Sequence, residues 1–303
     1  MTDSGKVFIL LFLIGFLVFS NGLKGDFIHD DLIVLSHSFF DQSSKIFSFF
    51  NQPYFEDFYQ AGLYRPLTQI SFAFNFLFSS APLGFHLVNV FLHVINSFLV
   101  FLLAGRLVKS NRLALIAALL FLVLPIHVEA VTSIVGRAEL LSFFFGILTL
   151  LLWFDSRYFL SAISLFLALL SKESAIAVVI ITFLFIRFYQ KRGVTRLRGE
   201  ERQDPEFLKW MIYHFGVLAM YFNMRIAVLG EYAFRTKVEF IFNPLAYVSF
   251  FERIFTALKI LTQYIVKVFV PLSLSADYSY EQIPVVTNLF SSPLALTCLA
   301  FFG

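Results

Sequence analysis

Two adjacent carboxylates, Asp30 and Asp31, are the residues of this sequence best suited to chemistry. Each raises the cost of ionising the other, so such a pair tends to divide into one proton holder and one anion. That division suits a general base, and it suits a metal or cation site equally well. The structural alternative is that Asp30 caps a short helix from Leu32 to Ser36, with Asp31 in its first turn. The spacing alone leaves both interpretations open.

Three further groups of ionisable side chains occur where long apolar runs end. They are Arg65; His127 and Glu129 together with Arg137 and Glu139; and Lys172 with Glu173. Ionisable groups at membrane depth are costly and usually face a cavity or one another, so their convergence predicts a site. The alternatives are that Arg65 only anchors a loop to lipid phosphates and that Lys172 and Glu173 only pair within a turn.

Two other polar patterns do not predict a ligand site. The spacing of His127 and Glu129 is similar to the start of a zinc deaminase motif, but the required Pro-Cys-x-x-Cys partner is absent, which excludes that interpretation. His86, Asn89 and His93 share one face of a predicted helix. Polar residues in such a row join helices more often than they bind a ligand.

The elements that must position these residues are membrane helices. The 303 residues are 59% hydrophobic and 14% charged, and the mean hydropathy is +0.80, which is outside the range of soluble globular domains. Cys298 is the single cysteine, so a disulfide framework or a cysteine-rich metal site is excluded. The composition therefore predicts an all-α polytopic membrane protein.

Apolar runs long enough to cross a bilayer number about eight, with a ninth beginning near Leu289. They are Val7–Leu23, Leu83–Leu107, Leu113–Ile126, Leu140–Phe154, Tyr158–Leu170, Ala175–Tyr189, Phe207–Leu229 and Ile254–Leu274. Several are short, so we expect tilted helices with polar ends near membrane depth. We expect residues 1–303 to be part of one membrane domain that is truncated at the C-terminus. The long loop at about 24–82 is rich in aromatic residues, which predicts interfacial helices.

Basic residues in short loops predict the orientation. The turn after the second run and the turn after the sixth are both basic, so both are expected in the cytoplasm with the N-terminus. These residues are Arg106, Lys109 and Arg112 in the first turn, and Arg187, Lys191, Arg192, Arg196, Arg198 and Arg202 in the second. The carboxylate pair and the three ionisable groups then share the opposite, lumenal or periplasmic face.

A series of motifs in a fixed order resembles one family. The stretches are Phe27–Asp31, Tyr64–Thr68, Gly84–His93, Leu124–Val131, Val135–Leu141, Ser171–Glu173 and Leu272–Ser279. The family is the transmembrane O-mannosyltransferases with tetratricopeptide repeats, of the GT-C glycosyltransferase superfamily. The resemblance implies a GT-C-type bundle, although the repeat array that family members carry is absent from this chain.

The resemblance also implies an inverting transfer of mannose from a polyprenyl (dolichyl-type) phosphate carrier to a Ser or Thr hydroxyl. The catalytic acid of the first external loop maps to Asp30 or Asp31, with Asp30 as the preferred base. The remaining candidates divide into cations for the donor phosphate and residues that shape the pocket. The cations are Arg137, Lys172 and Arg65, and the pocket-shaping residues are His29, His127, Glu129, Glu139 and Glu173.

The expected partners are a polyprenyl-phosphate sugar donor, a protein or glycan acceptor, and membrane lipids. No cofactor is predicted, and a divalent metal is not favoured, because protein O-mannosyltransferases are thought to act without one. Nucleic-acid binding is not expected, because the basic linker Gln190–Pro205 lacks interleaved aromatic residues. Two alternatives stay open: a GT-C transferase acting on a glycolipid or envelope polysaccharide, and a transporter of lipid-linked sugars. The expected location is the endoplasmic reticulum in a eukaryote or the inner membrane in a bacterium.

Overall fold

A computed structural model describes residues 3–35, 43–55, 61–191, 204–234, 240, 243–272, 275, 278 and 282–302. Over these residues the chain forms helices and no strands, which confirms the predicted all-α class. Contacts divide the chain into two compact units. The first is Met1–Val123 with Ala130–Phe234, and the second is Leu124–Glu129 with Arg235–Gly303. Asp277, in the last of the sequence motifs, lies outside the described residues.

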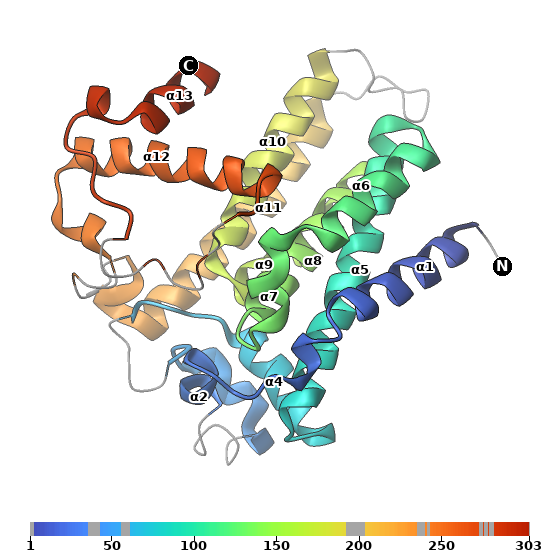
Figure 1. The fold of residues 1–303 in the computed structure, drawn as a ribbon. Helices are drawn as coiled ribbons and strands as arrows, with labels where there is room; N and C mark the ends of the chain where they lie inside the picture. The colour runs from blue at the N-terminus through green and yellow to red at the C-terminus, as the bar shows by residue number, and fades with distance from the viewer. Residues whose placement is uncertain are drawn as a thin grey trace. The chain divides into compact units, whose positions relative to one another are not determined.

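The first unit contains long helices joined by short ones (Figure 1). The long helices are α1 (Asp3–Val18), α4 (Pro66–Phe78), α5 (Pro82–Val108), α6 (Asn111–Val123), α8 (Arg137–Phe154), α9 (Tyr158–Ser171), α10 (Ile176–Lys191) and α11 (Asp204–Leu229). The short ones are η1 (Gly22–Lys24), α2 (Asp30–Val34), η2 (Ser43–Asn51), η5 (Glu173–Ala175) and η6 (Gly230–Ala233), and α7 (Val128–Thr132) contributes residues to both units.

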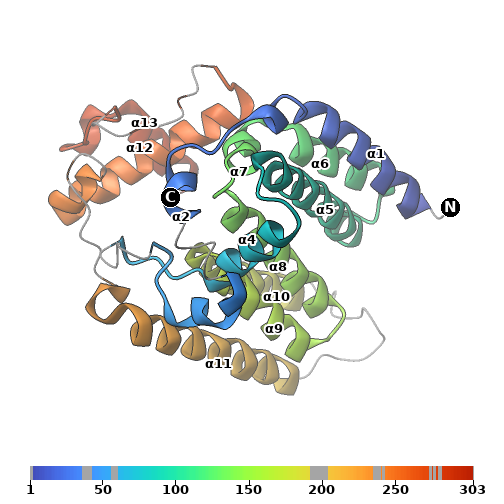
Figure 2. The ribbon, with the colours of Figure 1, turned by 90° about the horizontal axis from the view of Figure 1, so that it is seen from below.

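The helices α1, α5, α8, α9 and α11 follow one another across the first unit, each packing against the next (Figure 2). The small residues Ala114 and Ala118 of α6 are completely buried in a cluster with Leu11 and Val94. Small side chains let helix backbones approach closely, which explains how α6 packs against both α5 and α1.

Among the residues that the structure describes, fewer helices meet the length of a full span than the sequence predicts. By length and composition, α5, α8 and Phe207–Ala233 are long and apolar enough to cross a membrane, and α6 with the following helix would make a fourth. The predicted first, fifth and sixth spans form shorter apolar helices at Ser4–Val18, Tyr158–Ser171 and Glu173–Ile186. The chain is an integral membrane protein by these criteria, with several helices shorter than 18 residues.

Proline positions explain several helix boundaries. Pro66 and Pro82 stand at the first position of α4 and α5, where a missing N–H leaves no helix bond unmade. Lys109 ends α5 in a left-handed conformation with φ of 54°. Pro125 prevents α6 from continuing, and the chain bends by 50° between α6 and the next helices.

One face of α5 is polar and buried. Asn89 donates through Nδ2 to the carbonyl of Ser133 at 2.9 Å, and Asn96 donates to the carbonyl of Leu140 at 2.9 Å. The Nε2 atom of His93 lies 3.1 Å from the carbonyl oxygen of Leu122. The prediction that Asn89 and His93 join helices is therefore confirmed.

The second unit contains η4 (Pro125–His127), η7 (Pro244–Tyr247), α12 (Phe250–Phe269), η8 (Leu289–Ser291) and α13 (Pro293–Phe302). A capping box starts α12: Ser249 and Glu252 each bond the backbone N–H of the other. Thr262 of α12 donates to the carbonyl of Leu294 in α13 at 2.8 Å. This unit covers the predicted eighth span and the start of the ninth.

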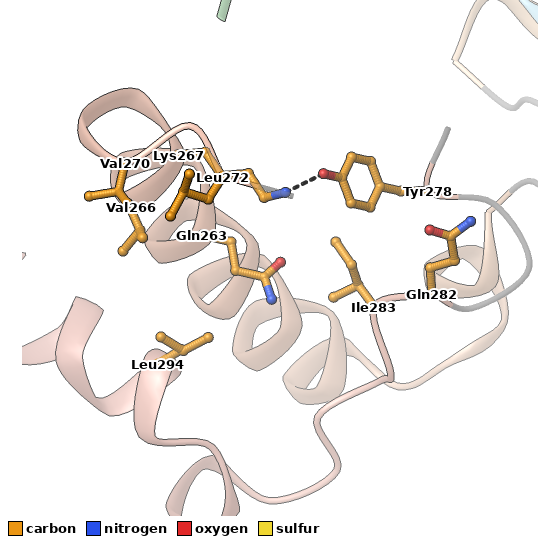
Figure 3. A pocket seen from close by; sticks show the side chains of 9 residues that line it. All are labelled: Gln263, Val266, Lys267, Val270, Leu272, Tyr278, Gln282, Ile283 and Leu294. Carbon is orange, nitrogen blue, oxygen red and sulfur yellow. Dashed lines mark hydrogen bonds between the residues drawn. The ribbon is translucent and has the colours of Figure 1, made fainter. Parts of the chain in front are cut away.

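A cavity of about 370 Å³ lies within the second unit (Figure 3). Its walls are mainly apolar, with Val266, Val270 and Leu272 among them, and the Lys267 ammonium donates to the hydroxyl of Tyr278 at its edge. None of the predicted site residues lines this cavity.

Candidate active site

The carboxylate pair lies at the start of α2, and its two side chains have different surroundings. Asp31 is 1% exposed. Its Oδ1 accepts a hydrogen bond from the N–H of Val135 at 2.9 Å, and its Oδ2 accepts one from the N–H of Ile28 at 3.2 Å. Asp30 is exposed. The helix starts at Asp30 with His29 at the N-cap position and no side-chain cap, so the capping alternative is not what the structure shows.

The backbone just before the pair is strained. His29 has φ of 47° and ψ of −119°, and its side chain is exposed. Positive φ is uncommon for residues other than glycine, and such conformations cost on the order of 1–3 kcal/mol and cluster at functional sites. His29 therefore determines the path of the loop through its backbone conformation. Its role in shaping a pocket stays a prediction.

Burial also distinguishes the two acids electrostatically. Desolvation raises the pKa of Asp31 above its ordinary value, although the hydrogen bonds from Val135 and Ile28 act in the opposite direction. Asp31 therefore holds a proton more tightly than an exposed aspartate does. The exposed Asp30 is the member of the pair that another molecule can contact.

The turn 133–136, whose Val135 N–H bonds to Asp31, is fixed by two further features. Asn89 donates to the carbonyls of Ser133 and Ile134 at 2.9 and 3.3 Å. Gly136 follows in the turn, where a Cβ atom would lie 2.4 Å from the carbonyl oxygen of Ala130. Only glycine fits this close approach of two backbone segments.

Arg137, the first residue of α8, is fully buried. Its Nε donates to Asn89 Oδ1 at 2.8 Å, and one terminal nitrogen donates to Asn75 Oδ1 and to the carbonyl of Phe85, both at 2.9 Å. The guanidinium also lies 4.8 Å from the ring centroid of Phe72. These neutral partners belong to α4 and α5, so Arg137 joins three helices. The sequence predicted that Arg137 contacts the donor phosphate directly. The burial of the guanidinium does not favour that contact, which stays a prediction.

Arg65 and Glu173 form a two-pronged ion pair. The Nε and one terminal nitrogen of Arg65 lie 3.0 and 2.6 Å from the carboxylate oxygens of Glu173. The guanidinium carbon lies 5.1 Å from the ring centroid of Tyr54. Burial is the largest single influence on the pKa of Glu173 and raises it, but the hydrogen bond and the charge of Arg65, with smaller contributions that include Lys172, together hold that pKa below its usual value.

A second ion pair lies next to the first. The Lys172 ammonium donates to the carboxylate of Glu139, and both side chains keep exposed surface. Thr68 of α4 donates to the carbonyl of Ser171 at 2.9 Å, which fixes the end of α9 beside α4. The structure thus brings Lys172 and Glu139 together with the Arg65 pair at one end of the first unit.

Two predicted pocket-shaping residues belong to the other compact unit, and their role stays a prediction. His127 and Glu129 belong to the second unit, where His127 is half-buried and Glu129 is exposed. The other predicted ionisable residues all belong to the first unit. They are Asp30, Asp31, Arg65, Arg137, Glu139, Lys172 and Glu173.

Sequence reasoning missed Asn75 and Tyr54. Asn75 was detectable, because it is a lone amide within the apolar run Phe72–Phe78, and an isolated polar group in such a run needs a partner. Tyr54, on which Arg65 stacks, carries no local signal among the many aromatic residues of the loop. Its position becomes visible only in the folded structure.

The arrangement offers an accessible carboxylate, a buried carboxylate behind it, and two cations that retain some exposure. This combination can accept a proton from a nucleophile and stabilise a departing anion. Among the residues that the structure describes, no group of three or more His, Cys, Asp or Glu side chains is placed to hold a metal ion.

Comparisons with known proteins were made by family, by sequence and by structure. No protein-family model matches the chain, and no solved structure matches it significantly. Curated relatives do match by sequence. Protein O-mannosyl-transferase TMTC3 of Mus musculus is 47% identical over 95 residues, which are 31% of this chain and 10% of the relative.

Two other relatives match over more of the chain. Protein O-mannosyl-transferase Tmtc2 of Drosophila melanogaster is 32% identical over 247 residues, which are 76% of this chain and 25% of the relative. Protein O-mannosyl-transferase F38B6.6 of Caenorhabditis elegans is 27% identical over 316 residues, covering 97% of this chain and 43% of the relative. The matches thus span less than half of each relative. They confirm the resemblance drawn from the motifs, and the chain belongs to the family of the protein O-mannosyl-transferases.

Proposed function

We propose that this protein transfers mannose from a polyprenyl-phosphate carrier to the hydroxyl groups of Ser and Thr residues in proteins. The name shared by its relatives supports mannosyl transfer to protein. The observation that carries the proposal is the division of the carboxylate pair, with Asp30 exposed and Asp31 buried and bonded to Val135.

In the proposed reaction, the hydroxyl oxygen of the acceptor attacks the anomeric carbon of mannose. The bond from that carbon to the phosphate oxygen of the carrier breaks, and the polyprenyl phosphate leaves with the bonding electrons. Asp30 takes the hydroxyl proton as the new bond forms. A positioned carboxylate in this role contributes about 10²–10⁴-fold to the rate.

Asp31 acts in this scheme by positioning Asp30. Its bond from the Val135 N–H fixes the first turn of α2 against the turn before α8, and its bond from the Ile28 N–H holds the residues just before that turn. Asp30 therefore projects from a rigid segment, which general-base catalysis requires because the proton must be accepted within hydrogen-bond distance.

The leaving phosphate needs cations, and Lys172 is the best placed. It retains exposed surface, whereas Arg137 has none. Arg65 is more enclosed and already bonded at two points by Glu173. We assign Lys172 to the carrier phosphate with Arg65 as a supporting charge, and Arg137 to holding the helices that present them.

The proposed site faces the lumen or the periplasm. Arg106 donates to Asp155 and to the carbonyl of Leu151, so the turn after α5 lies beside the turn after α8. Both turns lie at the opposite helix ends from Arg137 and Lys172. The basic residues near Arg106 favour the cytoplasm for that end.

The test measures mannose transfer from a polyprenyl-phosphate donor to a Ser/Thr peptide for Asp30→Asn, Asp31→Asn and the double variant. Asp26→Asn is the matched control, because Asp26 is an exposed acid of the same loop that bonds only its neighbour Phe27. We expect Asp30→Asn to lose at least about 10²-fold in turnover while donor binding persists. Near wild-type turnover in the double variant would exclude the pair from catalysis. Transfer to a glycolipid but not to the peptide would change the acceptor class.

A further inference from the structure

Two polar side chains near the carboxylate pair are buried without a hydrogen-bond partner among the described residues. They are Tyr54, whose hydroxyl is unpaired, and His86, whose Nδ1 and Nε2 are both unpaired; each residue is 3% exposed. A buried polar atom without a partner costs on the order of 1–3 kcal/mol, and native structures contain few of them. Two beside one carboxylate indicate a ligand that supplies the missing bonds.

Tyr54 approaches the pair from the long loop. It packs in the cluster that contains Val34 of α2 and Phe85 of α5. The charges of both Asp30 and Asp31 act on its hydroxyl, and burial raises the pKa of that hydroxyl. Its neutral form therefore persists at ordinary pH, available both to donate and to accept a hydrogen bond.

His86 approaches the same carboxylate from α5. Gly25, at the start of the loop, lies against the imidazole: a Cβ on Gly25 would be 3.2 Å from His86 Nε2. His86 lies close enough to Asp31 to influence it electrostatically. On the polar face of α5, Asn89 and His93 are hydrogen-bonded to backbone carbonyls. Among the described residues, neither ring nitrogen of His86 has such a partner.

We propose that Tyr54 and His86 bind the hydroxyl groups of the donor sugar beside Asp31. This inference rests on the proposed mannosyl transfer. A phenol and an imidazole suit uncharged hydroxyls, since both offer hydrogen-bonding atoms that the hydroxyls of a sugar can meet. One pyranose ring carries several hydroxyls and so offers more than one bonding partner, whereas a Ser or Thr acceptor brings one hydroxyl, which Asp30 needs in the proposed reaction.

The enclosure of these atoms adds a requirement. Gly25 covers His86, and the strained His29 lies in the same segment, Gly25–Leu35. In this proposal the sugar reaches Tyr54 and His86 when the segment shifts, and the bond from the Val135 N–H to Asp31, which joins the segment to the turn before α8, holds it closed afterwards.

The test uses Tyr54→Phe and His86→Leu in the full-length protein. Each change removes polar atoms that have no partner, so thermal stability should be unchanged or higher. Affinity for the mannosylated polyprenyl phosphate should fall by about tenfold for Tyr54→Phe, the effect of one lost hydrogen bond, and by at least about tenfold for His86→Leu, which removes two bonding atoms. Affinity for the sugar-free polyprenyl phosphate should not change.

The matched controls are a tyrosine and a histidine whose side chains already have hydrogen-bond partners within the protein. Tyr64 donates through its hydroxyl to the carbonyl of Phe50 at 2.9 Å, and His93 is bonded to Leu122. Tyr64→Phe and His93→Leu should lower thermal stability and leave both affinities unchanged.

Three outcomes would overturn the inference. Equal losses for both carriers would place Tyr54 and His86 at the phosphate or lipid, unchanged affinities would mean that they hold only water, and a large loss of stability would make them structural. Failure of the wild-type protein to bind the mannosylated carrier is a separate result, which would refute the proposed donor itself.

Discussion

Asp31 accepts a hydrogen bond from the backbone N–H of Val135, 104 positions further along the chain. This bond joins the loop after α1 to the turn before α8, which the fold brings together in the first unit. The side chain of the adjacent Asp30 is exposed. The two acids of the motif therefore differ in their surroundings: Asp31 holds the loop, and Asp30 is the one that we propose meets the substrate.

Removing the carboxylate of Glu173 should destabilise the protein. Glu173→Gln leaves Arg65 enclosed without its charged partner, and breaking such a pair costs up to about 3–5 kcal/mol when it is fully buried; partial exposure of Glu173 reduces this to about 1–3 kcal/mol. Thermal unfolding in detergent measures the loss. Asp155→Asn is the control, because the exposed pair with Arg106 contributes at most about 1 kcal/mol.

The effect of Glu173 should depend on pH in a defined direction. Its pKa in the folded protein lies below the ordinary value of 4.5. The stabilisation is then fully present above the pKa of the unfolded chain and is lost as pH falls through the folded pKa. The stability difference between wild type and Glu173→Gln should be constant near pH 7 and shrink below about pH 4.5. A difference that grows on acidification would contradict the assignment.

Gly136→Ala should destabilise the turn that receives Asp31. Its new Cβ would lie 2.4 Å from the carbonyl oxygen of Ala130, so the backbone must shift, at a cost of about 1–3 kcal/mol. Gly216→Ala in α11 is the matched control, because nothing lies within 4 Å of its Cβ position. That change should stabilise the helix by up to about 1 kcal/mol. Equal melting temperatures for the two variants would refute the close approach.

Substitution of Arg137 separates a structural role from phosphate binding. Arg137→Lys keeps the charge but cannot reach Asn89 and Asn75 together, so we expect a loss of about 3 kcal/mol or more in stability. Thermal unfolding and donor affinity are measured on the same preparations. Normal stability with weakened donor binding would instead support the direct phosphate contact predicted from the sequence.

Cysteine labelling tests the orientation. With Cys298 replaced by Ala, single cysteines at Asn51 and at Ser110 should react with an impermeant reagent from opposite sides of the membrane. The basic turn that contains Ser110 is expected in the cytoplasm and the loop that contains Asn51 outside it. Labelling of both from one side would reverse or remove the proposed face of the site.

The sequence predicts the helices well where apolar runs are long, as in α5 and α8, because composition and Pro82 define them directly. It also predicts that Arg65, Lys172 and Glu173 share one end of the helices. It does not predict which charges pair: the bond of Arg65 to Glu173 spans 108 positions and depends on how α4 packs against α9. Likewise, the buried state of Arg137 follows from three helices meeting, which no local pattern encodes.

The short helices expected among the predicted spans have a physical consequence, which α6 illustrates. Helix α6 has 13 residues, which at 1.5 Å per residue reach about 20 Å, short of a hydrocarbon core of about 30 Å. The apolar run that includes it is interrupted by Pro125, and hydropathy does not register such a break. Short helices of this kind leave irregular backbone within the thickness of the membrane.

The polar face of α5 has a consequence for how the protein is made. Backbone carbonyls such as those of Leu122 and Ser133 have no water to bond within a bilayer, and His93 and Asn89 take the place of that water. A ribosome delivers α5 before α6 and the turn that follows it. The side chains of His93 and Asn89 are thus already in the membrane when α6 and the following turn insert, and they can bond the backbone carbonyls that lose their water.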